Sequence, residues 1–317
     1  MNIDLTDAKF HDENAAREWF ELSRWPNGVT CVHCGGVRVA RMGGTSGRPG
    51  LFHCPDCRGQ FTVRTGHVME SSKVPLTKWA IAFHMLTNSK KGMSAHQLHG
   101  TIKVAYNTAW FMEHRIREAM RDTDPALLGG EGKVVEADET YHGKRETPRV
   151  PSAQRKGRPF TKSGKGGGAE KRSIVALVER GGKARAQHMN TITAKNMSEF
   201  LALNADTKSR LHTDESKLYP ALGTAFASHE TVNHAAKEYA RGDVTTNSVE
   251  GFFGIFKRGF NGIYQHCGEQ HLQRYLDEYS FRYSNRSKLG IEDARRAVIA
   301  TQGGEGKRLT WRRTNGA

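Results

Sequence analysis

The segment KVVEAD, residues 133–138, is a short run of apolar and β-branched residues that leads to a carboxylate. Such a run predicts a β-strand. A linker marked by Asp124-Pro125 and Gly129-Gly130 precedes it, so the strand opens a new domain. A single acidic residue here, Asp138, would be tolerated on any surface strand, so its meaning depends on the residues later in the chain.

Six further elements are expected after this strand. They are two strands joined by a hairpin-like turn at 180–183, a helix, a strand that ends at Asp214, and two long helices. Their ranges are 173–179, 184–189, 194–206, 209–213, 247–260 and 269–285.

Between the first two strands lies a basic stretch, residues 143–172, with six Gly, three Pro, ten Lys or Arg and only two acidic residues. This composition predicts a flexible loop. Two interpretations stay open: contact with a phosphate backbone, or a solvated insertion without a partner.

Three carboxylates stand out by their order in the chain. Asp138 lies in one predicted strand, Asp214 ends another, and Glu250 lies early in the next predicted helix. Clustered carboxylates repel and raise one another's pKa, and divalent cations remove that cost. Hard oxygen ligands select Mg²⁺ or Mn²⁺, and two such ions can act on the attacking and leaving oxygens of a phosphodiester.

The neighbouring acidic residues need separate treatment. Because a strand alternates its faces, Glu139 is expected to point away from Asp138. Glu136 shares the face of Asp138 and stays open as an auxiliary metal ligand.

The helix that carries Glu250 has two distinct sides. Asn247, Glu250, Gly254 and Lys257 fall on one face, so Lys257 would hold a DNA phosphate two turns beyond the metal ligand. The other side is expected in the core and carries Phe252, Phe253, Phe256 and Phe260.

Four of the five cysteines form two Cys-x2-Cys pairs separated by 19 residues, namely Cys31, Cys34, Cys54 and Cys57. This spacing predicts a structural Zn²⁺ site, because the four thiolates complete a tetrahedron and leave no position open for catalysis. Cys267 stands alone and is expected to be a packed or idle thiol.

A helical segment lies between the cysteines and the linker. Pro75 opens one helix, Ser94 caps a second that runs to His99, and a third begins near Lys103. A turn at Gly100 between the last two predicts a helix-turn-helix, with an ordinary helical bundle as the alternative. Side chains expected to face DNA are Lys103, Tyr106, Asn107 and Arg115.

The composition points to an acidic partner. Lys and Arg outnumber Asp and Glu by 48 to 33, which gives a net charge of +15 and a pI near 9.7. Nucleic acid is the commonest such partner, although a merely basic protein has the same balance. Without a long apolar run or a signal peptide, the expected location is the cytoplasm, at the nucleoid of a bacterium, with no membrane partner.

These motifs together resemble insertion-sequence transposases that carry an N-terminal zinc ribbon and an ISXO2-like DDE domain. The similar stretches cover nearly all of residues 15–290 in order. They are CVHC…CPDC, FTVRTGHVMESSKVPLTKW, SAHQLHGTIKVAYNTAWFMEHRIREAM, VVEADETYHGK, LHTDES, NSVEGFFGIFKRG and YLDEYSFRYSNR.

The resemblance implies a multidomain α+β protein with a zinc ribbon, a helix-turn-helix-like segment and a ribonuclease-H-like core with a mixed central sheet. It implies an acidic triad of Asp138, Asp214 and Glu250, with Asn247 as the substitute to test at the third position. Residues implied to bind double-stranded DNA are Lys257, Arg258, Lys103, Asn107, Arg115 and Asn247.

The implied activity is Mg²⁺-dependent cleavage at transposon ends and transfer of the 3'-OH into target DNA, by at least a dimer. The expected domains are 1–72, 73–128, 129–290 and a basic tail, 291–317, loose from Gly303 onward. Two alternatives remain: a ribonuclease-H-like nuclease or resolvase that cuts without joining, and a non-catalytic zinc-ribbon DNA-binding regulator.

Overall fold

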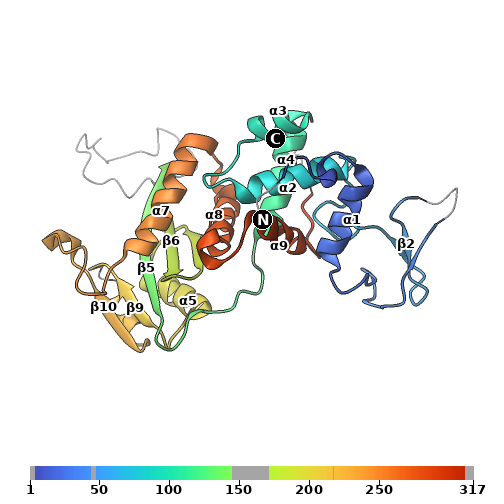
Figure 1. Ribbon diagram of the computed structural model, residues 1–317. Coiled ribbons are helices and arrows are strands. Elements are labelled where there is room, and N and C mark those ends of the chain that lie inside the picture. The colour runs from blue at the N-terminus through green and yellow to red at the C-terminus, as the bar shows by residue number, and fades with distance from the viewer. Residues whose placement is uncertain (1–3, 44–47, 145–170, 217, 311–317) are drawn as a thin grey trace, which may run out of the picture. The chain divides into compact units, whose positions relative to one another are not determined.

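A computed structural model describes residues 4–43, 48–144, 171–216 and 218–310. The chain divides into two compact units (Figure 1). The first combines Met1–Thr123 with Asn285–Ala317, and the second is Asp124–Ser284. Most of the basic stretch at 143–172 falls on 145–170 and so lies outside the described residues. No helix in the described part of the chain is long and apolar enough to cross a membrane.

The first unit begins with a helix and a small sheet. A 3-10 turn (η1, Ala8–Phe10) leads to α1 (Glu13–Arg24), and the Asp12 side chain caps α1 by accepting from the Ala15 amide at 2.7 Å. Three antiparallel two-residue strands come next and form the zinc-ribbon sheet. They are β1 (Ala40–Arg41), β2 (Phe52–His53) and β3 (Gln60–Phe61).

Four further helices complete the described part of this unit. They are α2 (Leu76–Asn88), α3 (Ala95–Ile102), α4 (Tyr106–Met120) and α9 (Asp293–Gln302), the last preceded by η5 (Ser287–Leu289). α3 begins with a capping box, in which Ser94 and Gln97 exchange hydrogen bonds.

The turn between α3 and α4 was predicted at Gly100, but it begins about three residues later, at Lys103. α3 continues through Gly100 to Ile102, and Lys103 ends it in the left-handed conformation with φ of 53°. His99 Nδ1 lies 2.7 Å from the Val104 carbonyl oxygen and closes the turn, so α4 begins at Tyr106 rather than near Lys103.

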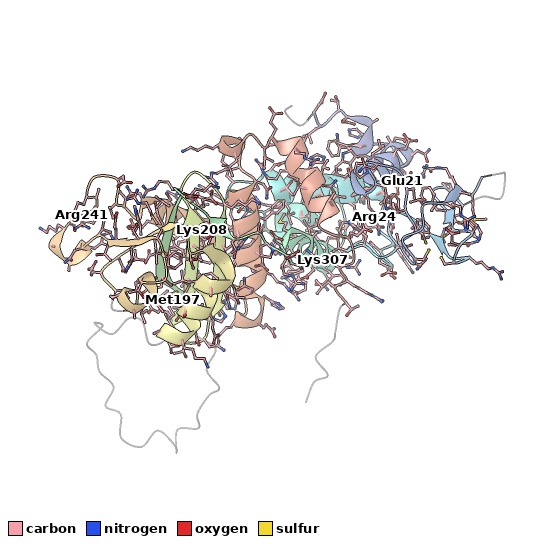
Figure 2. All side chains as sticks on the ribbon, turned by 90° about the horizontal axis from the view of Figure 1, so that it is seen from below. Glu21, Arg24, Met197, Lys208, Arg241 and Lys307 are labelled. Atoms are coloured by element: carbon pink, nitrogen blue, oxygen red, sulfur yellow. The ribbon has the colours of Figure 1, made fainter. Side chains whose placement is uncertain are left out.

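The expectation of a loose tail is also wrong for residues 303–310. Glu305 forms an ion pair with the buried Arg24 at 3.0 Å, and Lys307 Nζ donates to the Glu118 carbonyl at 3.1 Å. Figure 2 labels Arg24 and Lys307. The Gly306 amide donates to the Gly66 carbonyl at 2.8 Å. These partners lie far away in the sequence, which is why local composition did not indicate them.

The second unit is built on a five-stranded mixed sheet with the order β10-β9-β5-β6-β7. β5, β6 and β7 are antiparallel neighbours, whereas β9 and β10 run parallel to β5. Their bounds are β5 Val134–Lys144, β6 Lys171–Glu179, β7 Ala184–Met189, β9 Arg210–Thr213 and β10 Ser228–Thr231. The predicted mixed central sheet is confirmed, although β10 was not predicted.

Helices cover both faces of this sheet (Figure 1). α7 (Asn247–Gly259) and α8 (Glu269–Ser284) pack on one face. Three of the four predicted phenylalanines lie in α7 and the fourth, Phe260, comes directly after it; all four are buried in one cluster with Ile174 and Ala176. α5 (Ala194–Asn204) packs on the other face against Val135 and Ala137.

The remaining elements of this unit are short. They are β4 (Leu128–Gly129), which pairs with β8 (Ala205–Asp206), α6 (Pro220–Gly223), η3 (His234–Ala236) and the π-helical turn η4 (Phe260–Tyr264). The helix predicted over 194–206 therefore ends two residues early, because its last two positions join the small parallel sheet.

Candidate active site

Strand register brings Asp138 and Asp214 to the same part of the sheet. In β5, Asp138 lies opposite Ala176 of β6, on the face covered by α7. β9 runs parallel to β5 with Glu136 paired to His212, so Asp214, two residues after His212, is level with Asp138. Neighbouring parallel strands thus place the two carboxylates side by side.

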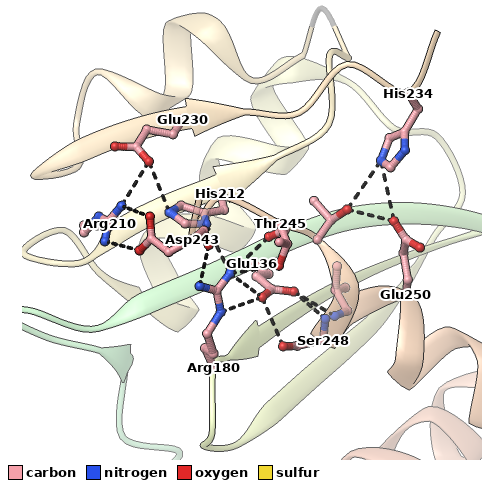
Figure 3. A network of polar contacts seen from close by, with 12 residues as sticks. Glu136, Arg180, Arg210, His212, Glu230, His234, Asp243, Thr245, Ser248 and Glu250 are labelled. Atoms are coloured by element: carbon pink, nitrogen blue, oxygen red, sulfur yellow. Dashed lines mark hydrogen bonds and ion pairs between the residues drawn. The ribbon is translucent and has the colours of Figure 1, made fainter. Parts of the chain in front are cut away.

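Glu250 lies in the first turn of α7, near enough for its charge to raise the pKa of Asp138. Within the part of the chain that the structure describes, only the four cysteines already gather at the spacing of ligands to one ion. Its Oε1 accepts a hydrogen bond from Thr246 Oγ1 at 2.8 Å and lies 3.5 Å from His234 Nε2 (Figure 3). The Glu250 side chain is 46% exposed, so its carboxylate can change rotamer at little cost.

The electrostatics of the three carboxylates are coupled. Burial raises the pKa of Asp138 to about 7, and the negative charges of Asp214, Glu139 and Glu250 add to this effect. Burial also raises the pKa of Asp214. Two neighbouring aspartates whose ionised forms are disfavoured suit a divalent cation, since bound positive charge offsets both the repulsion and the desolvation cost.

The four cysteines of the ribbon converge as the spacing predicts. All four sulfur atoms lie within 4.8 Å of one another, with Cys31 Sγ 3.6 Å from Cys57 Sγ and Cys34 Sγ 3.7 Å from Cys54 Sγ. Zinc–sulfur bonds of about 2.3 Å in a tetrahedron give sulfur separations of about 3.8 Å. The cluster therefore has the dimensions of a structural zinc site.

Two models of known protein families match the parts of the chain that carry the two candidate sites. The model of the transposase zinc-ribbon domain matches residues 11–60, and that of the ISXO2-like transposase domain matches residues 127–284. The chain belongs to the ISXO2-like transposases. Together the two models span about two thirds of this transposase and contain all four zinc-ribbon cysteines and all three candidate carboxylates.

One curated relative matches the transposase over almost its whole length. It is a protein of Halobacterium salinarum described as an uncharacterized protein in transposable element ISH50. The two are 29% identical over 300 residues, which cover 92% of the transposase and 97% of the relative.

Two solved structures match more distantly. A pre-cleavage Mos1 transpososome matches with 13% identity and a TM-score of 0.26, over 71% of the transposase and 79% of that chain. A Mos1 transposase paired-end complex with the left transposon end matches with 12% identity and a TM-score of 0.21, over 72% and 80% of the two chains. Similarity at this level supports no argument about fold or function.

Two residues near the carboxylates were not predicted from the sequence. His234 lies beside Glu250 and lowers the pKa of Asp214, although burial, which raises it, dominates. Tyr219 donates its hydroxyl hydrogen to Glu139 Oε2 at 2.6 Å, on the sheet face opposite to α7. Both lie in segments without an apolar pattern or a recognised motif, so no local signal marked them.

Glu136 is not available as an auxiliary metal ligand. Its side chain has no exposed surface, and both carboxylate oxygens already accept hydrogen bonds from Arg180, Ser248 and Val249. The shared strand face indicated a possible ligand, but the partners that occupy this residue lie 44 to 113 positions away in the chain.

The residues expected to bind DNA lie in both units. In α7, Asn247 and Arg258 are exposed and Lys257 is half-buried. In the first unit, Lys103 and Asn107 are exposed at the turn before α4 and in its first turn. Arg115 is half-buried, donates to the Glu70 carbonyl at 3.0 Å, and stacks on Phe111.

Replacing Asp138 with asparagine is expected to stabilise the transposase at pH 8 in the absence of Mg²⁺. The folded-state pKa of about 7 exceeds the ordinary value of 3.8, so the ionised carboxylate destabilises the fold above about pH 7. This penalty declines as the pH falls and is lost below 3.8. The gain in the free energy of unfolding should be on the order of 3 kcal/mol at pH 8.

Thermal unfolding of zinc-loaded protein between pH 8 and pH 5 measures this gain, which should shrink steadily with falling pH. The control is Glu199→Gln, an exposed carboxylate on α5. A gain that is the same at every pH would contradict the assignment of a raised pKa to Asp138.

Proposed function

We propose that this transposase cuts DNA at the ends of its element and joins the freed 3'-OH to target DNA, with Asp138, Asp214 and Glu250 holding two Mg²⁺ or Mn²⁺ ions. The observation that carries the proposal is the register of the sheet, which places Asp138 and Asp214 level with each other, with Glu250 in the first turn of the helix that covers this face. Burial raises the pKa of Asp138 to about 7, and the nearby charges of Asp214 and Glu250 add to this effect. Their hard oxygen donors suit these cations rather than softer metals.

The protein groups have defined tasks in this scheme. When bound, the cations would supply Lewis-acid stabilisation of the attacking and leaving oxygens. Asp138 and Asp214 must lose their protons for the cations to bind, which is costly at acidic pH because the pKa of each is raised. Glu250 must leave its hydrogen bond with Thr246 to join them.

Each of the two reactions breaks one phosphodiester bond: the first is a hydrolysis and the second a transesterification. In the first, water attacks the phosphodiester at the transposon end, and the bond to the 3' oxygen breaks to leave a 3'-OH. In the second, this 3'-OH attacks a target phosphodiester, so that a new phosphodiester forms while the target strand releases its own 3'-OH.

We propose double-stranded DNA as the partner of both units. The net charge of +15 favours a polyanion, and the ribbon and α3–α4 segment would hold the terminal repeats. The basic stretch at 143–172 would contact backbone phosphates. Residues proposed to contact DNA are Lys103, Asn107, Arg115, Asn247, Lys257 and Arg258.

Assembly and location can be inferred from the same reaction. Because joining requires two transposon ends in one complex, at least a dimer should act, and we place its action at the nucleoid in the cytoplasm. We also propose the four domains expected from the sequence, 1–72, 73–128, 129–290 and 291–317, as functional divisions within the two compact units.

A strand-transfer assay tests the proposal. The substrates are the DNA flanking the gene that encodes this chain and a supercoiled target plasmid, in Mg²⁺. We expect joined products with new 3'–5' phosphodiester bonds. Cleavage without joining would favour a ribonuclease-H-like nuclease or resolvase, and DNA binding without cleavage would favour a non-catalytic regulator.

A further inference from the structure

The N-terminus of α7, the helix that carries Glu250, is not capped by its own flanking residue. Thr246 occupies the N-cap position, but its side chain makes no capping hydrogen bond. Its hydroxyl donates instead to Glu250 Oε1. The first backbone N–H groups of a helix need acceptors, so another group must satisfy them.

Glu136 supplies that acceptor from the middle of the sheet. Its Oε2 accepts from the Ser248 amide at 2.7 Å and from the Val249 amide at 3.1 Å, while Oε1 accepts from Ser248 Oγ at 3.0 Å. A carboxylate at this position also interacts favourably with the positive end of the helix dipole. β5 and α7 are thereby joined through a fully buried charge.

Arg180, in the turn between β6 and β7, balances this charge and extends the network (Figure 3). Its Nε and Nη2 donate to Glu136 Oε1 at 3.0 and 2.9 Å. Nη2 also lies 3.3 Å from His212 Nδ1 in β9 and donates to Thr245 Oγ1 at 3.1 Å. Nη1 donates to the Asp243 carbonyl at 2.7 Å.

Each candidate metal ligand lies two residues beyond a member of this network. Asp138 comes after Glu136 in β5, Asp214 after His212 in β9, and Glu250 after Ser248 in α7. Glu136 is bonded directly to Ser248, and Arg180 links Glu136 to His212. Movement of α7 relative to the two strands would therefore break several buried hydrogen bonds at once.

We propose that Glu136 and Arg180 form a positioning pair, which fixes the helix of Glu250 against the strands of Asp138 and Asp214 and so sets the spacing of the three carboxylates. This inference rests on the proposed function, in which those carboxylates bind divalent cations. Neither member of the pair touches substrate or metal in this scheme. Both act through the backbone elements that they connect.

Mn²⁺ binding to the full-length, zinc-loaded protein tests the pair, with free Mn²⁺ measured by electron paramagnetic resonance. Glu136→Gln keeps the size of the side chain and one carbonyl oxygen but removes the charge that Arg180 and α7 share. Residues that orient metal ligands typically contribute about 10- to 100-fold to metal affinity. We therefore expect Glu136→Gln to weaken Mn²⁺ binding at least about 10-fold, and Glu199→Gln to leave it unchanged.

A milder pair of variants keeps the test valid if Glu136→Gln does not fold. Ser248→Ala removes one hydrogen bond to Glu136 but preserves both backbone contacts, and Ser248→Thr restores the hydroxyl. Mn²⁺ affinity should fall in Ser248→Ala and recover in Ser248→Thr, at similar melting temperatures. A change in stability alone would not produce this recovery.

Asp138→Asn separates failure of the pair from failure of the proposed function. If Asp138→Asn loses Mn²⁺ binding while folded Glu136→Gln and Ser248→Ala bind as the wild type does, the positioning role is overturned and the proposed function stands. If Asp138→Asn itself binds Mn²⁺ with wild-type affinity, the proposed metal site is wrong and the inference falls with it.

Discussion

Replacing Asp138 or Asp214 with asparagine is expected to lower strand transfer in Mg²⁺ by at least about 1,000-fold, or roughly 4 kcal/mol in activation free energy. Each substitution keeps the shape of the side chain but removes a charged oxygen ligand. Because the two residues lie level on adjacent parallel strands, loss of either leaves the cations with an incomplete ligand set. Gel analysis of cleaved and joined DNA measures both reactions.

The matched control for this prediction is Glu199→Gln, which changes an exposed carboxylate on α5 and should transfer strands at the wild-type rate. Glu250→Gln and Asn247→Ala, compared in the same assay, identify the third ligand. Wild-type strand transfer by either aspartate variant would place the active site elsewhere in the chain.

The second large effect is expected in the ribbon. The double change Cys31→Ser and Cys54→Ser should abolish zinc binding, since it removes the two buried ligands of the four. Structural zinc contributes about 10–16 kcal/mol of binding free energy in zinc-finger peptides, far more than sheets of two-residue strands can supply. The ribbon of the variant should therefore be unfolded.

Zinc content measured by mass spectrometry, together with proteolysis of residues 29–65, tests this expectation. Cys267→Ser is the control, because Cys267 is a buried cysteine outside the ribbon. This variant should still bind one zinc per chain. Full zinc retention in the double variant would exclude the four-cysteine site.

Elements marked by local patterns of residues could be predicted from the sequence. The valine-rich run before Asp138 predicts β5, and the phenylalanines at helical spacing predict α7 with its buried side. The paired cysteines predict the ribbon because two metal-binding turns need only a few residues each. The predicted helix cap at Ser94, which the structure confirms, is a short-range pattern of the same class.

The features that sequence did not predict depend on contacts between distant residues. β10 consists of Ser228-His229-Glu230-Thr231, which has no apolar alternation, and it forms a strand because β9 offers it a parallel edge. Glu136 had the strand position of a metal ligand, but Arg180 and the start of α7 determine its role. The fold determines such partners, and the residues next to them in the sequence show no pattern that indicates them.

The return of residues 285–310 to the first unit has a consequence for synthesis on the ribosome. α9 packs against α1 and α2, and Glu305 neutralises the buried Arg24, so the helical unit lacks part of its core until the end of the chain emerges. The sheet unit, whose residues are contiguous, can fold while translation continues. A transcript cut short after Ser284 would therefore encode an intact sheet unit beside an unfinished helical one.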